Sequence, residues 1–577
     1  MKYKELKPIG KSTVKSVIAG ALLCSLSAPL SAGEPNASEL DAAIMTGDFA
    51  GYLAGATVWL NQKTPAKPDE SALATLLKDP VFRTVLDQRQ LIAKTGADKL
   101  GAFARADPAH REFLGWLFKN TPAMDLYLEG VVPIGLAARE ADKYTLDPAA
   151  LAIWEKILAA DPDAREGIYL KLAIATVIQP PGSINIGAGG AATPAAPVVR
   201  YKYYKTAHQQ KALFPSFDHL TVWEYTRVVS SGASDADLTW ARDMINTFRP
   251  DLRAHELVVN STSLVWRRGS PIPYANSFKN VLAGGGKCGP RSSWSVMICQ
   301  AFGIPAIGVG QPKHACVAYK ADHPLTPPQP GCAWKVGFGG GWPVSKLLGL
   351  SGPEFLAGVE KRSDPAKFSQ VEHLRWLAGA LTAADRAAVV MDMARKINDS
   401  ITAAKAGVPK DTVAAATGAG STVPIKAVDG VRHVEAAAFV QTGGRNSWGG
   451  QVPHVLVHDC FTGGRQVYFQ QQMKSQWADY IVEVPVSGIY KVVMQAACIN
   501  TDQALEVCSG TNVIATVSIP LSYGLWQETA PVELKLEKGV QTLRVQTSPQ
   551  APMRGIALRW FDLKTTGPCR EPPEGKK

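Results

Sequence analysis

The spacing of apolar residues divides the chain into three parts, of which the first is helical. Over residues 38–182 apolar positions recur every three to four residues, as they do on one face of an amphipathic helix. In the stretch LAIWEKILAADPDAREGIYLKLAIATVI, Trp154, Ile157 and Leu158 share such a face. Asp161-Pro162 then supplies an N-cap and a proline at the first helical position. We therefore expect an α-helical N-terminal region.

The middle of the chain, residues 200–407, mixes helices with short strands. PRSSWSVMICQAFG predicts a helix with Pro290 near its start and Gly303 at its C-terminal cap. IPAIGVG, HACVAYK and AWKVGFG are short apolar runs between turn residues, which predicts strands. Stretches rich in Gly, Ala and Pro at 183–199 and 408–430 predict linkers on either side. The expected fold of this part is α+β.

In the last part, residues 431–565, apolar residues recur at every second position. Segments such as WADYIVEVPVSGIYKVVMQAAC and PVELKLEKGVQTLRVQT alternate apolar and polar residues between Ser-Gly, Lys-Gly and Pro turns. Short strands at this regular spacing predict an all-β sandwich of the jelly-roll type. A chain of 577 residues is also too long for one core, so a multidomain protein is expected.

The first 32 residues have the order of a secretory signal peptide. Lysines are followed by the apolar run VIAGALLCSL and then by small residues in SAPLSAGEP. The run is too short for a membrane span, and no other segment approaches one, so no transmembrane segment is expected. We expect export to the periplasm, the cell surface or the medium.

The net charge of +11 does not indicate nucleic-acid binding. The predicted signal peptide carries part of it, and the rest is spread without a cluster of Lys or Arg, which indicates a solvated surface. Export permits disulfides. Cys498 and Cys508 are placed either to close a hairpin or to be two buried thiols in strands, and Cys316 is a candidate partner for Cys332.

The segment GGGKCGPRSSW carries the most specific chemistry. It places Cys288 at the N-terminus of a helix. There the unpaired N–H groups and the helix dipole favour a thiolate, and the same N–H groups can donate to an oxyanion. A cysteine nucleophile needs a base, and His314 begins a strand that can run alongside the helix start. The alternative is a buried thiol and an ordinary hydrogen-bonded histidine. A zinc site is disfavoured because the ligand spacing is irregular.

KCGPRSSWSVMICQAFGIPAIGVGQPKHACVAYK resembles the catalytic core of the transglutaminase-like superfamily, through Cys-Gly, Gly-Ile-Pro and His-Ala. The resemblance implies a papain-like core, Cys288 as nucleophile, His314 as general base, a peptide or protein amide as substrate and no cofactor for catalysis. The family usually has Asp or Asn on the next strand, but CAWKVGFGGGW contains neither. Asp322 and Gln311 are both candidates for the third member.

The C-terminal segment 431–563 resembles β-sandwich carbohydrate-binding modules of families six and thirty-five, through W-x-x-Y-x-V-x-V-P-x-x-G-x-Y and L-x-x-G-x-x-T-L-R. The resemblance implies a carbohydrate partner and a structural calcium held in part by Glu435. Glu435 is followed by two alanines, where the family often has a second carboxylate. Trp448, Tyr523 and Trp526 are candidates for stacking on a sugar.

The sequence thus predicts an exported cysteine enzyme of the transglutaminase-like type, directed to a glycan or surface polymer. It would be a protease or amidase if water accepts the acyl group, and an acyltransferase if an amine does. The alternative is a non-catalytic envelope or matrix adhesion or glycan-binding protein that retains the fold.

Overall fold

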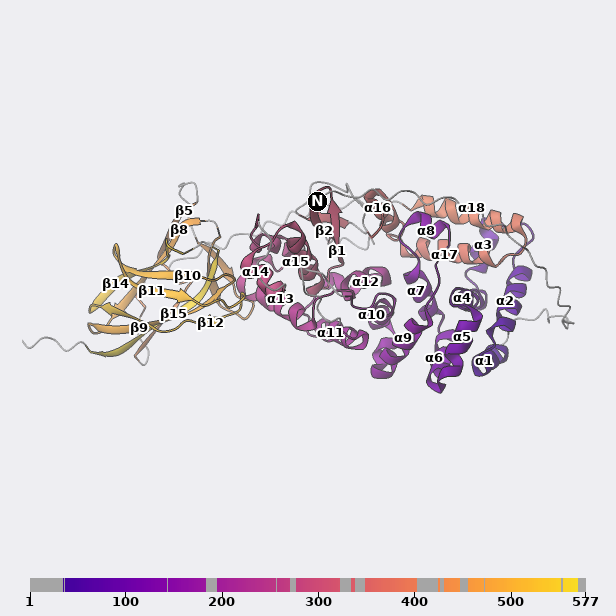
Figure 1. Ribbon diagram of the computed structural model, residues 1–577, viewed down its shortest axis with the longest axis horizontal. Coiled ribbons are helices and arrows are strands. Elements are labelled where there is room, and N and C mark those ends of the chain that lie inside the picture. The colour runs from indigo at the N-terminus through magenta and orange to yellow at the C-terminus, as the bar shows by residue number, and fades with distance from the viewer. Residues whose placement is uncertain are drawn as a thin grey trace, which may run out of the picture.

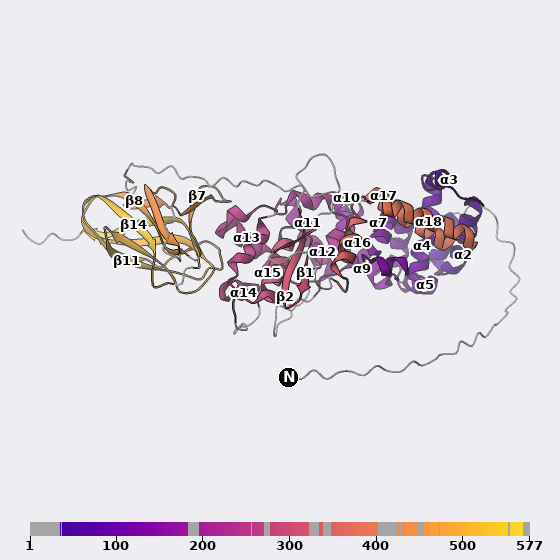
Figure 2. The ribbon, with the colours of Figure 1, turned by 90° about the horizontal axis from the view of Figure 1, so that it is seen from above.

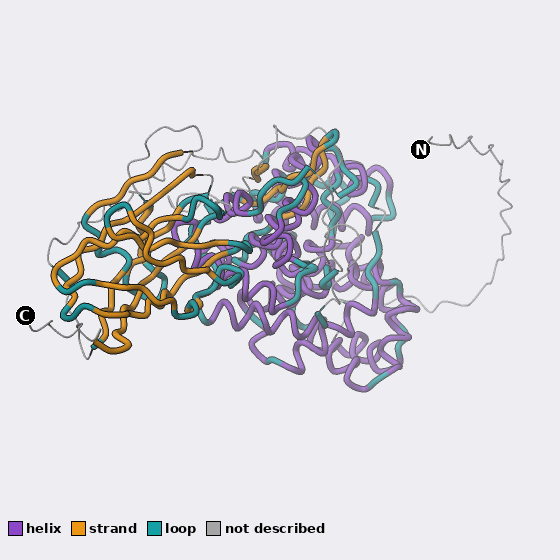
Figure 3. The backbone as a smooth tube through the Cα atoms, turned by 60° about the vertical axis from the view of Figure 1, so that its left-hand side comes forward, coloured by secondary structure: helices purple, strands orange, loops and turns teal. Residues whose placement is uncertain are grey.

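The protein is elongated and consists of a β-sandwich, a mixed central part and a helical part, arranged in a row (Figures 1 and 2). The computed structural model describes residues 35, 37–142, 144–182, 195–255, 257–269, 277–321, 334–337, 348–401, 424–425, 430–446, 455–471, 473–551 and 554–568. The predicted signal peptide and most of both predicted linkers lie outside these residues. Strands dominate one end of the molecule and helices the other (Figure 3).

The N-terminal part is helical, as predicted. Aspartates cap several of its helices, including Asp79, Asp107 and Asp147, each followed by a proline at the start of the helix. Trp154 is fully buried between neighbouring helices, on the apolar face expected from the sequence. The helices are α1 (Ala37–Thr46), α2 (Phe49–Lys63), α3 (Glu70–Leu76), α4 (Pro80–Thr95), α5 (Ala97–Ala106), α6 (Pro108–Phe118), α7 (Thr121–Val131), α8 (Leu136–Glu140), α9 (Pro148–Ala160) and α10 (Gly167–Ile178), with the 3-10 helix η1 (Pro162–Arg165).

The central part combines helices with a three-stranded antiparallel sheet in the order β1-β2-β3. The longest helix beside this sheet, α15, packs against β2 and buries Trp294 completely. The elements are α11 (Pro197–Gln209), η2 (Pro215–His219), α12 (Val222–Val229), α13 (Asp235–Phe248), η3 (Pro250–Leu252), η4 (Val258–Leu264), α14 (Phe278–Gly284), α15 (Cys288–Ala301), β1 (Ala306–Gln311), β2 (His314–Lys320), β3 (Trp334–Gly337) and α16 (Gly352–Glu360).

Two further helices, α17 (Pro365–Ala380) and α18 (Ala384–Ser400), return to the N-terminal part. Helix α17 packs against α2, α4 and α7. The side-chain amide of Asn61 on α2 donates to the carbonyl of Ala380 at 2.9 Å, and its oxygen accepts from the amide of Thr382 at 2.9 Å. The stretch 200–407, expected to form one central domain, therefore ends in helices that complete the helical part.

The C-terminal part consists of two antiparallel sheets, as the alternating pattern predicts. One has the order β11-β10-β14-β8-β5 and the other β12-β9-β15-β7-β6, with β13 on β9 and β4 on β15. Their apolar faces enclose a separate core that includes Tyr480, Val492 and Phe561. The strands are β4 (Val431–Glu435), β5 (Gln441–Asn446), β6 (Leu456–Asp459), β7 (Arg465–Phe469), β8 (Met473–Val484), β9 (Gly488–Cys498), β10 (Gln503–Ser509), β11 (Asn512–Ile519), β12 (Gln527–Glu528), β13 (Val532–Leu536), β14 (Gly539–Thr547) and β15 (Ile556–Pro568).

The sandwich is docked on the central part rather than separate from it. The amide of Asn500 donates to the carbonyl of Ala283 on α14, and the guanidinium of Arg554 lies 4.4 Å from the ring centroid of Trp266. The indole of Trp240 on α13 donates to the carbonyl of Tyr523 at 3.1 Å. Tyr468 of the sandwich belongs to the hydrophobic core that the helical and central parts share.

A glycine makes this docking tight. Gly524 has φ +80°, and a Cβ there would lie 2.4 Å from Cγ of the fully buried Met244. We expect Gly524→Ala to cost about 2–4 kcal/mol of stability, from the left-handed backbone and the clash together. Gly510→Ala is the matched control, because Gly510 has φ +58° and open space around it. Equal melting temperatures for the two variants in differential scanning calorimetry would contradict the role of this contact.

Cys498 and Cys508 are free and buried, so the structure favours two strand thiols over a Cys498–Cys508 disulfide. Cys316 is also free and buried, and its candidate partner Cys332 lies outside the described residues. Cys498 donates to the carbonyl of Asn500 at 2.7 Å, which ties down the loop after β9. No helix among the described ranges is long and apolar enough to cross a bilayer.

Candidate functional site

Cys288 is the first residue of α15, in the place that the sequence predicted. The preceding loop is shaped by Gly285, which has φ +75° and lies so close to Trp266 that a Cβ would meet its ring at 2.6 Å. The N-cap residue is Lys287, whose side chain makes no capping hydrogen bond. Many of the described helices, such as α4 and α13, are capped by a side-chain oxygen, whereas α15 has no side-chain acceptor from the cap for its first-turn N–H groups.

His314 begins β2, immediately after a two-residue turn. Pro312 and Lys313 form the turn, and Lys313 adopts φ +58°, a conformation that side chains other than glycine rarely take. Ser292 on α15 donates to the carbonyl of Cys316 on β2 at 2.5 Å and so holds the start of the helix against the strand. Cys288 and His314 are thereby brought to the same end of the α15–β2 pair.

One cavity of about 590 Å³ is lined by both residues. The rest of its lining is basic apart from one glycine, and consists of Arg267, Arg268, Gly269, Lys287, Arg291 and Lys313. Cys288 is half-buried, whereas the other five described cysteines are buried. Burial raises the pKa of Cys316, and the nearby thiol of Cys288 raises it further. Cys316 is thus an inert neighbour of the site, and Cys288 is the thiol that solvent reaches.

The structure describes one of the two candidates for a third catalytic member. Gln311 lies directly opposite His314 in the β1–β2 register, so the two side chains project from the same face of the hairpin. Asp322 lies outside the described residues. Of β3, the described residues Trp334–Gly337 contain no carboxylate or carboxamide, in line with the departure noted in the sequence. Gln311 is therefore the candidate that the described residues place beside the imidazole.

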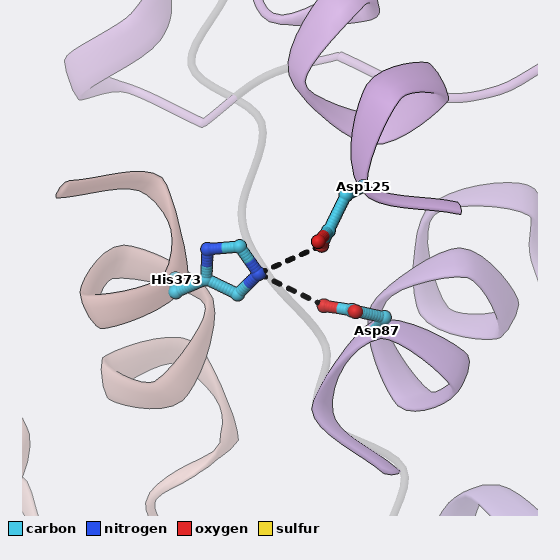
Figure 4. A group of neighbouring side chains, drawn as sticks. All are labelled: Asp87, Asp125 and His373. Carbon is cyan, nitrogen blue, oxygen red and sulfur yellow. Dashed lines mark hydrogen bonds and ion pairs between the residues drawn. The ribbon is translucent and has the colours of Figure 1, made fainter. Parts of the chain in front are cut away.

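A second polar cluster, which the sequence did not reveal, lies in the helical part. His373 of α17 points its Nε2 between Asp125 of α7 and Asp87 of α4, at 2.8 Å and 3.2 Å (Figure 4). Arg83 contacts Asp125 as well, and the Nδ1 of His373 lies 2.7 Å from the carbonyl of Ser369. Asp87 and His373 are almost completely buried.

Among the described residues, these three form the one group whose possible ligand atoms lie close enough together to hold a metal ion. Burial opposes the charge of His373, but the bonds to Asp125 and Asp87 raise its pKa to about 10. Burial raises the pKa of Asp87 to about 8 against the bond to His373. A metal would have to displace the proton of His373 beside the guanidinium of Arg83. The cluster is better described as a buried ion-pair network that joins α4, α7 and α17.

The predicted sugar-stacking residues are distributed unevenly. Tyr523 and Trp526 are partly buried and pack against the core that the helical and central parts share, so they lie at the docking interface. Trp448 lies outside the described residues. Glu435 on β4 is exposed, and its carboxylate lies 3.2 Å from Nε2 of His433, which in turn pairs with Asp562. Calcium prefers six to eight oxygen ligands, whereas this carboxylate contacts an imidazole. The structural calcium stays a prediction.

The basic lining of the Cys288 cavity was also missed in the sequence. Its five cations come from three separate segments, at 267–268, 287–291 and 313, so no stretch of the chain has the local density of charge that marks a basic patch. The tertiary arrangement alone brings them together.

Comparison with known proteins yields structural neighbours only. No protein-family model matches the chain, and no curated protein matches it either. Among solved structures, the C-terminal CBM6 of LamC, a marine laminarinase from Zobellia galactanivorans, is similar at 16% identity and a TM-score of 0.19, over 23% of this chain and 99% of that one. CBM6cm-2 from Cellvibrio mixtus lichenase 5A, in complex with cellotriose, matches at 21% identity and 0.19, over 23% and 97%. A family 35 carbohydrate-binding module from Clostridium thermocellum matches at 14% identity and 0.19, over 24% and 98%. At these identities and TM-scores the likenesses support no conclusion about a ligand of this chain.

Proposed function

We propose that the protein is an exported cysteine enzyme of the transglutaminase-like type that attacks an amide carbonyl. The observation that supports this most is the cavity that Cys288 and His314 line together. Cys288 lies at the N-terminus of a helix, and His314 lies at the start of a strand. The Cys288 thiolate would add to the carbonyl carbon, and the first-turn N–H groups of α15 would face the oxyanion.

The remaining steps follow from proton balance. His314 takes the proton of the Cys288 thiol and delivers it to the departing amine, so the C–N bond breaks and a thioester remains. Water or an amine then attacks the thioester, His314 takes its proton, and the thiol is regenerated. Hydrolysis makes the protein a protease or amidase, and attack by an amine makes it an acyltransferase.

The proposal has a direct test that needs no known substrate. We expect iodoacetamide to label Cys288 first among the described cysteines of the folded full chain. In a pool of glutamine- and asparagine-containing peptides, added hydroxylamine should trap the thioester as a hydroxamate. Cys288→Ala should abolish hydroxamate formation, and His314→Ala should reduce it by about 10²–10⁴-fold. His219→Ala, a change at an exposed imidazole, serves as the control.

The alternative function is non-catalytic binding to a glycan or matrix. It is favoured by the lack of a carboxylate or carboxamide in Trp334–Gly337. Under this alternative Cys288 would be labelled no faster in the wild type than in His314→Ala, and no hydroxamate would form.

Glycan binding by the sandwich is part of both functions. It is supported by the sequence stretches shared with carbohydrate-binding modules and by the two-sheet fold. Retention of the full chain on a glycan array, undiminished in Cys288→Ala, is the expected result. An array without any bound glycan would leave the sandwich as a structural part of the enzyme.

A further inference from the structure

The charge of the Cys288 cavity is one-sided. Five of its eight lining residues are Lys or Arg, and none of the described lining residues is acidic. The chain as a whole has 61 basic and 50 acidic residues, so chance would place acids in such a cavity nearly as often as bases.

The cations are held in place by backbone interactions. Residues 266–268 run beside the loop before Cys288, where Gly286 donates to the carbonyl of Trp266 at 3.0 Å and Arg268 donates to the carbonyl of Gly286 at 3.1 Å. Arg267 and Gly286 form an isolated parallel bridge. Lys313 occupies the strained turn before His314. Arg267, Lys287 and Lys313 thus come from three separate segments that line the cavity of the thiol.

Some buried or half-buried arginines of the protein pair with acids, whereas others donate to neutral oxygens, as Arg242 does to Tyr203 and to the carbonyl of Ala301. Arg200 meets Asp235 at 2.7 Å, and Arg544 meets Asp479 at 2.8 Å. At the cavity, the exposed residues Arg267, Lys287 and Lys313 form no ion pair within the described part of the chain. Arg268 and Arg291 direct N–H groups to the carbonyls of Gly284 and Thr262. Burial lowers the pKa of Arg291, and the charge of Arg267 lowers it further, as expected for cations that crowd one another.

Cations that converge on one cavity attract an anionic ligand when, like Arg267, Lys287 and Lys313, they have no acidic partner among the described residues. Several positive charges that converge on one concave site raise the local concentration of anions and the rate of their association. Arginine and lysine at such a site bind carboxylates by charge-assisted hydrogen bonds. Separate surface lysines would be ordinary solvated residues, but here they surround the candidate nucleophile.

We infer that the Cys288 cavity takes an acidic peptide, in which carboxylates flank the amide that is attacked. This inference rests on the proposed function for the choice of a peptide, since thioester chemistry requires an amide carbonyl. An anionic polysaccharide would satisfy the charges but offers no such carbonyl in its backbone, and it is an outcome of the test.

The first test uses the thiol as a reporter. Iodoacetate and iodoacetamide alkylate a thiol by the same displacement of iodide and differ in charge. We expect the ratio of the iodoacetate to the iodoacetamide rate at Cys288 to fall about tenfold or more in the double variant Arg267→Glu/Lys287→Glu. Raising the salt from about 20 mM to about 0.5 M should lower the wild-type ratio towards that of the variant. Lys202→Glu, an exposed change on α11, is the matched control and should leave the ratio unchanged.

The second test measures binding without chemistry. Calorimetric titration of the full-length Cys288→Ala protein compares a pentapeptide of alternating glutamate and glutamine, the same peptide with serine in place of glutamate, and polygalacturonate. We expect the acidic peptide to bind at least tenfold more tightly than the neutral one, and Arg267→Glu/Lys287→Glu to remove the difference.

Failure of the inference differs from failure of the proposed function. Equal binding of acidic and neutral peptides, or tighter binding of polygalacturonate than of the acidic peptide, would overturn the inference whether or not hydroxamate forms. If no hydroxamate forms but the preference for the acidic peptide is retained, the proposed catalysis is wrong. The cavity is then a binding site for acidic peptides. If Cys288 reacts with neither reagent, the calorimetric comparison alone decides.

Discussion

Replacing Arg139 with methionine is expected to lower the stability of the helical part by about 3–5 kcal/mol. Arg139 on α8 donates through Nε to Glu372 on α17 at 2.6 Å, and both side chains are nearly inaccessible to solvent. Methionine fills much of the same volume, so the loss comes from leaving the carboxylate of Glu372 buried without its partner. The melting temperature and the hydrogen-exchange protection of α17 are the measurements.

A double variant separates the charge from the packing. Arg139→Met combined with Glu372→Leu should recover most of the stability, because an apolar pair can replace a buried ion pair at little cost. Lys396→Met breaks an exposed pair with Asp392 and should leave the melting temperature unchanged. If the double variant is no more stable than Arg139→Met alone, the loss does not arise from the stranded carboxylate.

The network around His373 is expected to make stability depend on pH in the alkaline range. The folded pKa of His373 is about 10, above the value of about 6.5 in an unfolded chain. The native state therefore holds this proton more tightly, and the resulting stabilisation is complete below about pH 6.5 and is lost as the pH rises through about 10. Asp87, with its pKa raised to about 8, acts in the same direction. Asp125, Arg83 and Glu129 are the other charged or titratable groups of the network.

Comparison with His373→Gln isolates this contribution. The variant should be less stable at pH 6.5 by about 3–5 kcal/mol, because the carboxylate of Asp125 on α7 loses its buried cation. From pH 6.5 to 10 the melting temperature of the wild type should fall by several degrees more than that of the variant. Parallel pH profiles for the two proteins would show that His373 is not protonated in the folded state.

The local elements could be predicted from the sequence because local rules determine them. The apolar face of α9 and the Asp161-Pro162 start of η1 depend on neighbours a few residues away, and they occur where the pattern indicates. The same holds for α15, from Cys288 to Ala301, and for the alternating strands of the sandwich. The positions of Cys288 and His314 at one cavity followed from the predicted helix and strand.

The long-range arrangement could not be predicted in this way. Nothing near His373 in the sequence marks Asp87 as its partner, because the hydrophobic period of α17 shows only that it has a buried face. Tyr523 stands beside a glycine in a turn, a pattern typical of exposed loops, yet the turn is covered by α13. The basic lining of the cavity arises from three segments, each of which carries only one or two cations.

The docking of the sandwich changes what a binding module could do for this protein. A module on a free linker raises the effective concentration of a bound polymer around the enzyme in all orientations. Here Asn500 and Arg554 contact Ala283 and Trp266, which belong to the two segments that carry the loop of Cys288. A polymer on the sandwich would therefore meet the thiol from one fixed direction. The distance between the point where the polymer attaches to the sandwich and the bond that reacts at Cys288 would then be fixed.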